Sequence, residues 1–128
     1  MVIDSSIIIA ILQNEPGAEN LIDALLDAAV RRVSAANLLE AAIVMQARYG
    51  DAGEREVDVL LQRLGIDVVP VTPQHAEIAR SAYRRYGKGR HPAGLNFGDC
   101  FAYALSKAMG ESLLFVSEDF GRTDVQRV

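Results

Sequence analysis

Met1-Val2-Ile3-Asp4-Ser5-Ser6 opens the chain with an apolar run that ends at an acid and continues into two serines. The run predicts a very short strand over residues 1–3, and the serines predict a helix start. A second apolar run, Leu113-Leu114-Phe115-Val116, predicts a buried strand near the end of the sequence. It is also followed by a serine and acids, Ser117-Glu118-Asp119. In an open α/β sheet, functional sites lie beyond the carboxyl ends of the strands. Both stretches therefore place acids where a site is expected.

The chain between these two stretches alternates between strand-like and helical patterns. Strand signals fall at residues 31–34 and 66–71, and Thr72 followed by Pro73 predicts a helix start. Helices are expected over residues 5–13, 18–29, 36–48, 54–64, 73–86 and 97–109. Short strands that alternate with helices predict an α/β fold of three layers, with a central, mainly parallel sheet flanked by helices. A length of 128 residues fits a single domain over residues 1–128.

The composition is that of an ordinary globular protein and narrows the classes of function. Thirteen basic and 17 acidic residues give a net charge of −4, so the chain as a whole lacks a basic footprint for nucleic acid. Cys100 is the only cysteine, which excludes an internal disulfide and favours a small buried hydrophobe over a nucleophile. We see no signal peptide, and the apolar run over residues 7–12 is too short to span a bilayer. A cytoplasmic protein without membrane contact is expected.

Four acids, Asp4, Glu40, Asp99 and Asp119, lie near the starts of predicted helices. Carboxylates that converge on one point repel each other and are costly to keep ionised together unless a cation lies between them. Oxygen-only ligands of this kind suit Mg²⁺ or Mn²⁺. The four acids together therefore predict a metal-dependent phosphodiesterase.

The first three acids also have structural alternatives. Asp4 could cap the first helix, although Ser5 and Ser6 could do the same. Glu40 could be the partner of Asn37 in a capping box, and Asp99 could be the partner of Asn96 in another. Glu40 lies in a stretch of apolar residues, where a buried carboxylate needs a partner or a metal.

The fourth acid is the least certain of the set. Asp119 could be a first-turn acid of a short helix capped by Ser117. Glu118 is the adjacent competitor for its functional role, and Asp124 is a more distant one.

A glycine-rich basic loop over residues 86–95 leads directly to Asp99. Its cations, Lys88, Arg90 and His91, could merely solvate the loop. Beside an acidic metal site, however, a flexible basic loop is suited to binding a phosphate backbone. We therefore expect Lys88 and Arg90 to contact nucleic acid.

The chain resembles the PIN-domain ribonucleases, and within them the VapC toxins of type II toxin–antitoxin systems. The resemblance covers essentially the whole chain and depends on the order and spacing of several blocks. These blocks are Val2-Ile3-Asp4-Ser5-Ser6, Glu40, Tyr86-Gly87-Lys88-Gly89-Arg90-His91, Leu95-Asn96-Phe97-Gly98-Asp99-Cys100, Leu113-Leu114-Phe115-Val116-Ser117-Glu118-Asp119-Phe120 and Thr123-Asp124.

The resemblance implies a metal-dependent endoribonuclease that uses Mg²⁺ or Mn²⁺. Asp4 and Asp99 match the family's principal metal ligands, Glu40 matches a further acid of the site, and Ser6 matches a supporting hydroxyl residue. Asp119 is the nearest match to the fourth acid. PIN domains often carry that acid three residues before a phenylalanine, but here that position is Ser117, so Glu118 and Asp119 both remain candidates.

The resemblance also implies partners. Family members are usually homodimers, and a cognate VapB-like antitoxin inhibits them by placing its tail in the acidic groove. The RNA target is expected to be a single-stranded loop of tRNA, rRNA or mRNA, where bases can be splayed out.

Two rival functions remain open from the residues alone. A non-catalytic PIN-like module could use the acids only to capture the basic tail of a partner. An aspartate-based phosphoryl-transfer enzyme would also place acids on a parallel α/β sheet, but its phosphatase form needs a second aspartate where this chain has Ser6.

Overall fold

A computed structural model describes residues 1–128 and contains one sheet of four parallel strands. The strands are β1 (Val2–Ile3), β2 (Arg31–Ser34), β3 (Ile66–Val69) and β4 (Leu113–Leu114), and their order across the sheet is β3-β2-β1-β4. The predicted α/β fold with a central parallel sheet is confirmed. Because β1 has β2 on one side and β4 on the other, the chain changes direction across the sheet at β1, where sites form in such folds.

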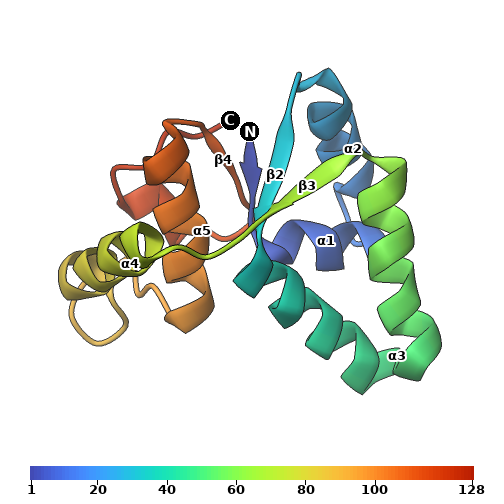
Figure 1. Cartoon of the computed structure of the whole chain (residues 1–128), viewed down its shortest axis with the longest axis horizontal. Coiled ribbons are helices and arrows are strands. Elements are labelled where there is room, and N and C mark those ends of the chain that lie inside the picture. Colours follow the sequence, from blue (N-terminus) through green and yellow to red (C-terminus); the bar gives the residue numbers. More distant parts are fainter.

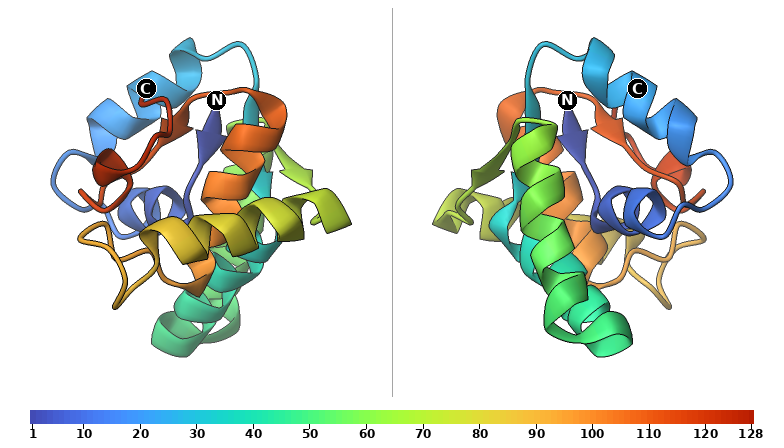
Figure 2. Two further views of the ribbon diagram at one scale, coloured as in Figure 1. Left: turned by 90° about the vertical axis from the view of Figure 1, so that its left-hand side faces the viewer. Right: turned by 90° about the vertical axis from the view of Figure 1, so that its right-hand side faces the viewer.

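Helices cover both faces of the sheet, as Figure 1 shows. On one side lie α1 (Ser5–Leu12), α2 (Ala18–Asp27) and α3 (Ala35–Arg63). On the other lie α4 (Pro73–Tyr86) and α5 (Phe97–Met109), and the left view of Figure 2 shows α4 crossing the outer face of α5. A short 3₁₀ turn, η1 (Phe120–Arg122), follows β4. None of these helices is both long enough and apolar enough to cross a membrane.

Two hydrophobic cores lie on opposite faces of the sheet, because successive side chains of a strand point in opposite directions. Ile3 and Leu114 belong to the core shared with α1, α2 and α3. Their neighbours Val2 and Leu113 belong to the core shared with α5, which also contains the fully buried Phe120. The shortest strands therefore contribute to both cores, and this fixes the position of the residues that follow them.

Two predicted strands are shorter than the sequence indicates. The third strand was predicted to reach Val71, but β3 ends at Val69, where its pairing with Ser34 also ends. Pro70 follows and has no N–H to donate to a sheet. The last strand was predicted to reach Val116, but β4 ends at Leu114, and Val116 is half exposed.

The two helices predicted over residues 36–48 and 54–64 are joined end to end in α3. Gly50 breaks the helical backbone with φ 70° and ψ −159°, so the predicted stop is present as a kink. The second half begins at once, and Gln46 spans the kink by donating hydrogen bonds to Asp51 (2.7 Å) and Glu54 (3.0 Å). No loop separates the halves.

Candidate metal centre

Asp4 follows β1 and caps α1, and it is 4% exposed. Its Oδ2 accepts hydrogen bonds from the backbone N–H of Ser6 (3.2 Å) and from the Ser6 hydroxyl (2.6 Å). Its Oδ1 is buried and has no hydrogen-bond partner. Burial, together with the negative charge of Glu40, raises the pKa of Asp4. The capping alternative is thus true, but it uses only one of the two carboxylate oxygens.

Glu40 lies on α3 and is held beside the start of α5. Asn37 is not the N-cap of α3, contrary to the capping-box alternative, because Ser34 accepts the backbone N–H of Ala36 (3.3 Å) and caps the helix. The buried Asn37 side chain instead donates to Glu40 Oε1 (3.3 Å) and to the backbone oxygen of Gly98 (2.9 Å). Asn37 and Gly98 were not among the site residues predicted from the sequence.

Asp99 is the partner of Asn96 in a complete capping box at the start of α5. Asn96 Oδ1 accepts the N–H of Asp99 (2.9 Å), and Asp99 Oδ2 accepts the N–H of Asn96 (3.0 Å). Burial raises the pKa of Asp99 to about 6, and the charges of three other acids add to this effect: Asp4, Asp119 and Glu40. Asp99 therefore lies near enough to each of the other three predicted acids for their charges to act on it.

Asp119 is the best placed of the three candidates for the fourth acid. It is half buried beyond β4, and its backbone N–H donates to the Ser117 hydroxyl (3.1 Å). Its charge acts on Asp99, whereas the adjacent Glu118 is exposed. This difference favours Asp119 over Glu118.

Asp124 has a structural role instead. It accepts a hydrogen bond from the Tyr103 hydroxyl (2.7 Å) and pairs with Lys107 (3.0 Å). Partial burial works against the charged form, but the Tyr103 hydrogen bond and the Lys107 charge outweigh it and lower the pKa of Asp124. Because the Asp124 carboxylate already binds Tyr103 and Lys107, it is poorly suited to bind a metal cation.

These residues fit a divalent cation that keeps much of its water shell. The ligand set is oxygen only, and Asp4 Oδ1 is a buried oxygen without a partner. No group of three acidic, histidine or cysteine side chains lies close enough to hold a metal ion by itself. Mg²⁺ is usually bound through one or two carboxylates and several waters, so it does not need such a group.

Cys100, directly after Asp99, is not a competing nucleophile. Burial and the neighbouring Asp99 charge raise the pKa of its thiol to about 11. The thiol is therefore protonated at neutral pH, which confirms the expected role as a small buried side chain.

The basic loop between α4 and α5 is anchored at both ends and exposed in between. Gly87 and Leu95 form an isolated bridge, closed by hydrogen bonds from Lys88 N to Leu95 O (2.9 Å) and from Leu95 N to Tyr86 O (2.9 Å). Lys88 and Arg90 are exposed between these anchors. Lys88 lines a cavity together with Asn96, at the start of the helix that carries Asp99, whereas the Arg90 guanidinium lies over the Tyr83 ring of α4.

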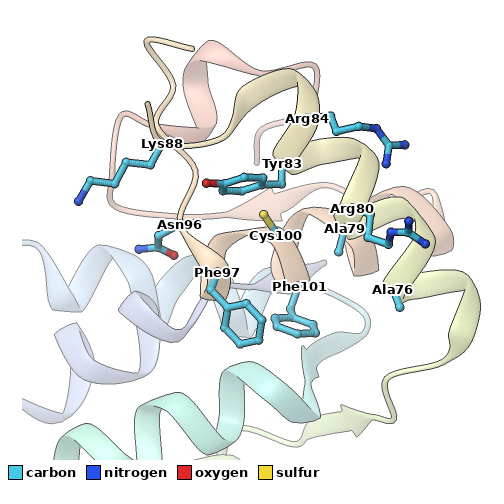
Figure 3. A pocket seen from close by; sticks show the side chains of 10 residues that line it. All are labelled: Ala76, Ala79, Arg80, Tyr83, Arg84, Lys88, Asn96, Phe97, Cys100 and Phe101. Atoms are coloured by element: carbon cyan, nitrogen blue, oxygen red, sulfur yellow. The ribbon is translucent and has the colours of Figure 1, made fainter. Parts of the chain in front are cut away.

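A largely apolar cavity of about 720 Å³ lies between α4 and α5, and Cys100, which follows Asp99 in the sequence, is part of its lining. Phe97 and Phe101 lie side by side on α5, with their rings 4.9 Å apart, and Tyr83 of α4 also lines the cavity (Figure 3). Phe97 is 81% exposed, which is unusual for a large apolar side chain. Arg80, Arg84 and Lys88 supply the charged part of the lining.

The chain matches one protein family over nearly its whole length. The family model described as the PIN domain matches residues 1–126. The chain belongs to the PIN-domain family. This PIN domain is 54% identical over 128 residues to a ribonuclease VapC of Mycolicibacterium smegmatis. The alignment covers 100% of this chain and 99% of that relative. It is 50% identical to the ribonuclease VapC30 of Mycobacterium tuberculosis, with 100% and 98% covered.

Solved structures agree on the fold. The PIN domain superposes on the crystal structure of Mycobacterium tuberculosis VapC20, described as a sarcin–ricin loop cleaving toxin, with a TM-score of 0.80 at 17% identity. That match covers 99% of this chain and 97% of VapC20. Rickettsia felis VapBC2, solved with a DNA fragment from its promoter, matches with a TM-score of 0.73 at 13% identity over 98% and 94% of the two chains.

The raised pKa of Asp99 predicts that the metal-free PIN domain loses stability as the pH rises from 5 to 7. The unfolded-state pKa is near 3.8 and the folded-state pKa near 6, so the folded state holds more protons in this window. Stability then falls with pH, by about 1–2 kcal/mol after allowance for solvent screening of a partly buried group. The raised pKa of Asp4 acts in the same direction.

Urea unfolding in EDTA at several pH values measures this trend. If the ionised carboxylates of the folded state hold Mg²⁺, saturating Mg²⁺ should remove the loss, because an ion bound only by the folded state stabilises it. The carboxyls with lowered pKa, Glu111 and Asp124, are already ionised at pH 5 and do not interfere. Stability that is flat or rising from pH 5 to 7 in EDTA would contradict the raised pKa of Asp99 and the burial that mainly causes it.

Proposed function

We propose that this PIN domain is a Mg²⁺- or Mn²⁺-dependent endoribonuclease and the toxin of a VapBC-type toxin–antitoxin module. The observation that carries the proposal is the buried Asp4 carboxylate, whose Oδ1 has no hydrogen-bond partner, at the carboxyl edge of the sheet. The raised pKa of Asp99, to which burial and the charges of Asp4, Asp119 and Glu40 contribute, supports the same site. The full-length similarity to ribonucleases named VapC supports the same function.

In this proposal, Asp4 and Asp99 are the metal ligands. Ser6 supports the site by binding Asp4 Oδ2, which leaves the unpartnered Oδ1 for the cation. Glu40 and Asp119 complete the acidic set and act on the ion through water. Because the four carboxylates are coupled, no single one is assigned as the base.

When bound, a divalent ion would polarise the scissile phosphate and lower the pKa of an attacking water. The protein supplies the remaining requirements. The capping box fixes Asp99 on a rigid helix start, and the sheet fixes Asp4 and Asp119 beyond neighbouring strands. Such preorganised charge needs little rearrangement during the reaction.

Lys88 and Arg90 are proposed to hold the RNA backbone near the acids, and their exposure on the loop supports this role. Lys88→Ala should weaken RNA binding by up to about tenfold, the size of one charge-assisted contact. It should also reduce the slope of log binding constant against log salt concentration by about one. Titrating a labelled RNA at several salt concentrations measures both effects. Arg63→Ala is the matched control, because Arg63 ends α3 just before the amino end of β3, at the opposite edge of the sheet. Equal effects of the two substitutions would argue against the loop as an RNA contact.

Protein partners are proposed from the exposed apolar side chains. Phe97 on α5, and Leu39 and Ile43 on α3, are all more than half exposed, and such groups mark protein interfaces when they cluster. Phe97 and Phe101 beside the cavity suit a homodimer contact (Figure 3), and the acidic site suits a basic tail of a VapB-like antitoxin. A cytoplasmic location fits a toxin that acts on cellular RNA.

The chemistry of the cut ends tests the reaction type. Attack by water leaves a linear phosphate on one fragment, whereas attack by the RNA 2′-hydroxyl leaves a 2′,3′-cyclic phosphate. We expect linear phosphate ends only, which enzymatic labelling or mass spectrometry of the fragments can show. Cyclic phosphate ends would overturn the water-attack mechanism. Absence of both cleavage and metal binding would favour the non-catalytic binding module.

A further inference from the structure

Gly98 lies in the first turn of α5, directly before Asp99, and its backbone conformation does not require glycine. Its φ angle is not positive, so any amino acid could adopt this backbone conformation. The space above it explains the glycine. A Cβ atom built on Gly98 would lie 2.7 Å from both Cδ and Oε1 of Glu40, and closer still to Oε2. The carboxylate of Glu40 therefore occupies the position of the missing side chain.

The Asn37 side chain contacts the same carboxylate. Its Nδ2 donates to Glu40 Oε1 (3.3 Å) and to the backbone oxygen of Gly98 (2.9 Å). Reversing the amide would place its oxygen against both acceptors, so the orientation is determined by the contacts. The Asn37 Oδ1 is buried without a partner, which costs free energy, so the two donated hydrogen bonds are what this amide contributes.

We infer that Asn37 and Gly98 are positioning residues that together place the Glu40 carboxylate over the start of α5, beside Asp99. Asn37 supplies the donors and Gly98 supplies the space. This inference rests on the proposed function for its catalytic consequence, but the contact itself does not depend on it. Neither residue touches the substrate in this role; each acts through Glu40.

Gly98→Ala tests the inference in two backgrounds, wild type and Glu40→Ala. In the wild type, the added methyl group should displace the carboxylate and lower RNA cleavage at least tenfold. The side chain it meets is flexible, so the protein should remain folded. In the Glu40→Ala background the methyl group meets no carboxylate. There, Gly98→Ala should leave the residual cleavage unchanged and raise the melting temperature, because alanine favours helix over glycine.

Two further variants separate positioning from general disturbance. Gly121→Ala is the matched control, since a Cβ there would lie 3.7 Å from Glu118 Oε2, which is ordinary contact. It should leave cleavage unchanged. Asn37→Leu fills a similar volume without donors and should also lower cleavage at least tenfold in the wild type, but not in the Glu40→Ala background.

The outcomes distinguish failure of the inference from failure of the proposed function. Equal loss of cleavage from Gly98→Ala in both backgrounds, or no loss in either, would overturn the inference and leave the ribonuclease function intact. A wild type that neither cleaves RNA nor binds metal would remove the proposed function. The melting temperatures would then still decide the contact: a larger gain from Gly98→Ala in the Glu40→Ala background than in the wild type supports it, and equal gains overturn it.

Discussion

Asp99→Asn is expected to reduce RNA cleavage by about a thousandfold while leaving the metal-free protein folded. The substitution removes a proposed metal ligand, and metal stabilisation of the reaction amounts to several kcal/mol, at about 1.4 kcal/mol per tenfold change in rate. Asparagine keeps an oxygen that can accept the N–H of Asn96, so the cap of α5 is retained. It also removes a charge that Asp4, Asp119 and Glu40 repel, so stability in EDTA should be equal or higher at pH 7.

Asp124→Asn provides the contrasting result. Asp124 pairs with Lys107 (3.0 Å) and is partly exposed, so its loss should cost about 1 kcal/mol or less of stability. Cleavage should stay at the wild-type level. Single-turnover cleavage and urea unfolding of both variants test whether Asp99→Asn loses cleavage but keeps stability, and whether Asp124→Asn keeps cleavage. Wild-type cleavage by Asp99→Asn would remove Asp99 from the metal site.

Phe120→Ala is expected to have the largest effect on stability, about 3–5 kcal/mol. Phe120 is fully buried, and its ring lies 5.3 Å from that of Phe115 in the core shared with α5. It directly follows Asp119, so this packing also fixes the position of the fourth acid. Cleavage per folded molecule should therefore fall together with stability.

Urea denaturation measures the loss, and Val116→Ala is the control in the same segment. Val116 is half exposed, so its truncation should cost less than about 1 kcal/mol. Similar losses from the two substitutions would show that Phe120 does not anchor the segment after β4.

Features with local signals could be predicted from the sequence. The acid after β1, the break at Gly50 and the capping box of Asn96 and Asp99 each depend on neighbouring residues, and the structure contains all three. The parallel sheet followed from the alternation of strands and helices, and it is also confirmed.

Features that depend on distant contacts could not be predicted. Asn37 is 61 residues away from Gly98, and no local pattern shows that its side chain is buried against that backbone. The choice between Asp119 and Asp124 likewise depends on Tyr103 and Lys107, which bind Asp124 from another element. The ends of β3 and β4 depend on where the neighbouring strands stop pairing.

Cleavage of total cellular RNA by the purified protein tests the proposed metal-dependent ribonuclease most directly. The reaction is run with Mg²⁺ or Mn²⁺, beside an EDTA control and an Asp99→Asn control, and the fragment ends are mapped by sequencing. We expect discrete fragments with the metal and none in either control, and the mapped ends would name the target. Fragments that persist in EDTA would contradict metal dependence, and neither cleavage nor metal binding by the wild type would contradict the enzyme itself.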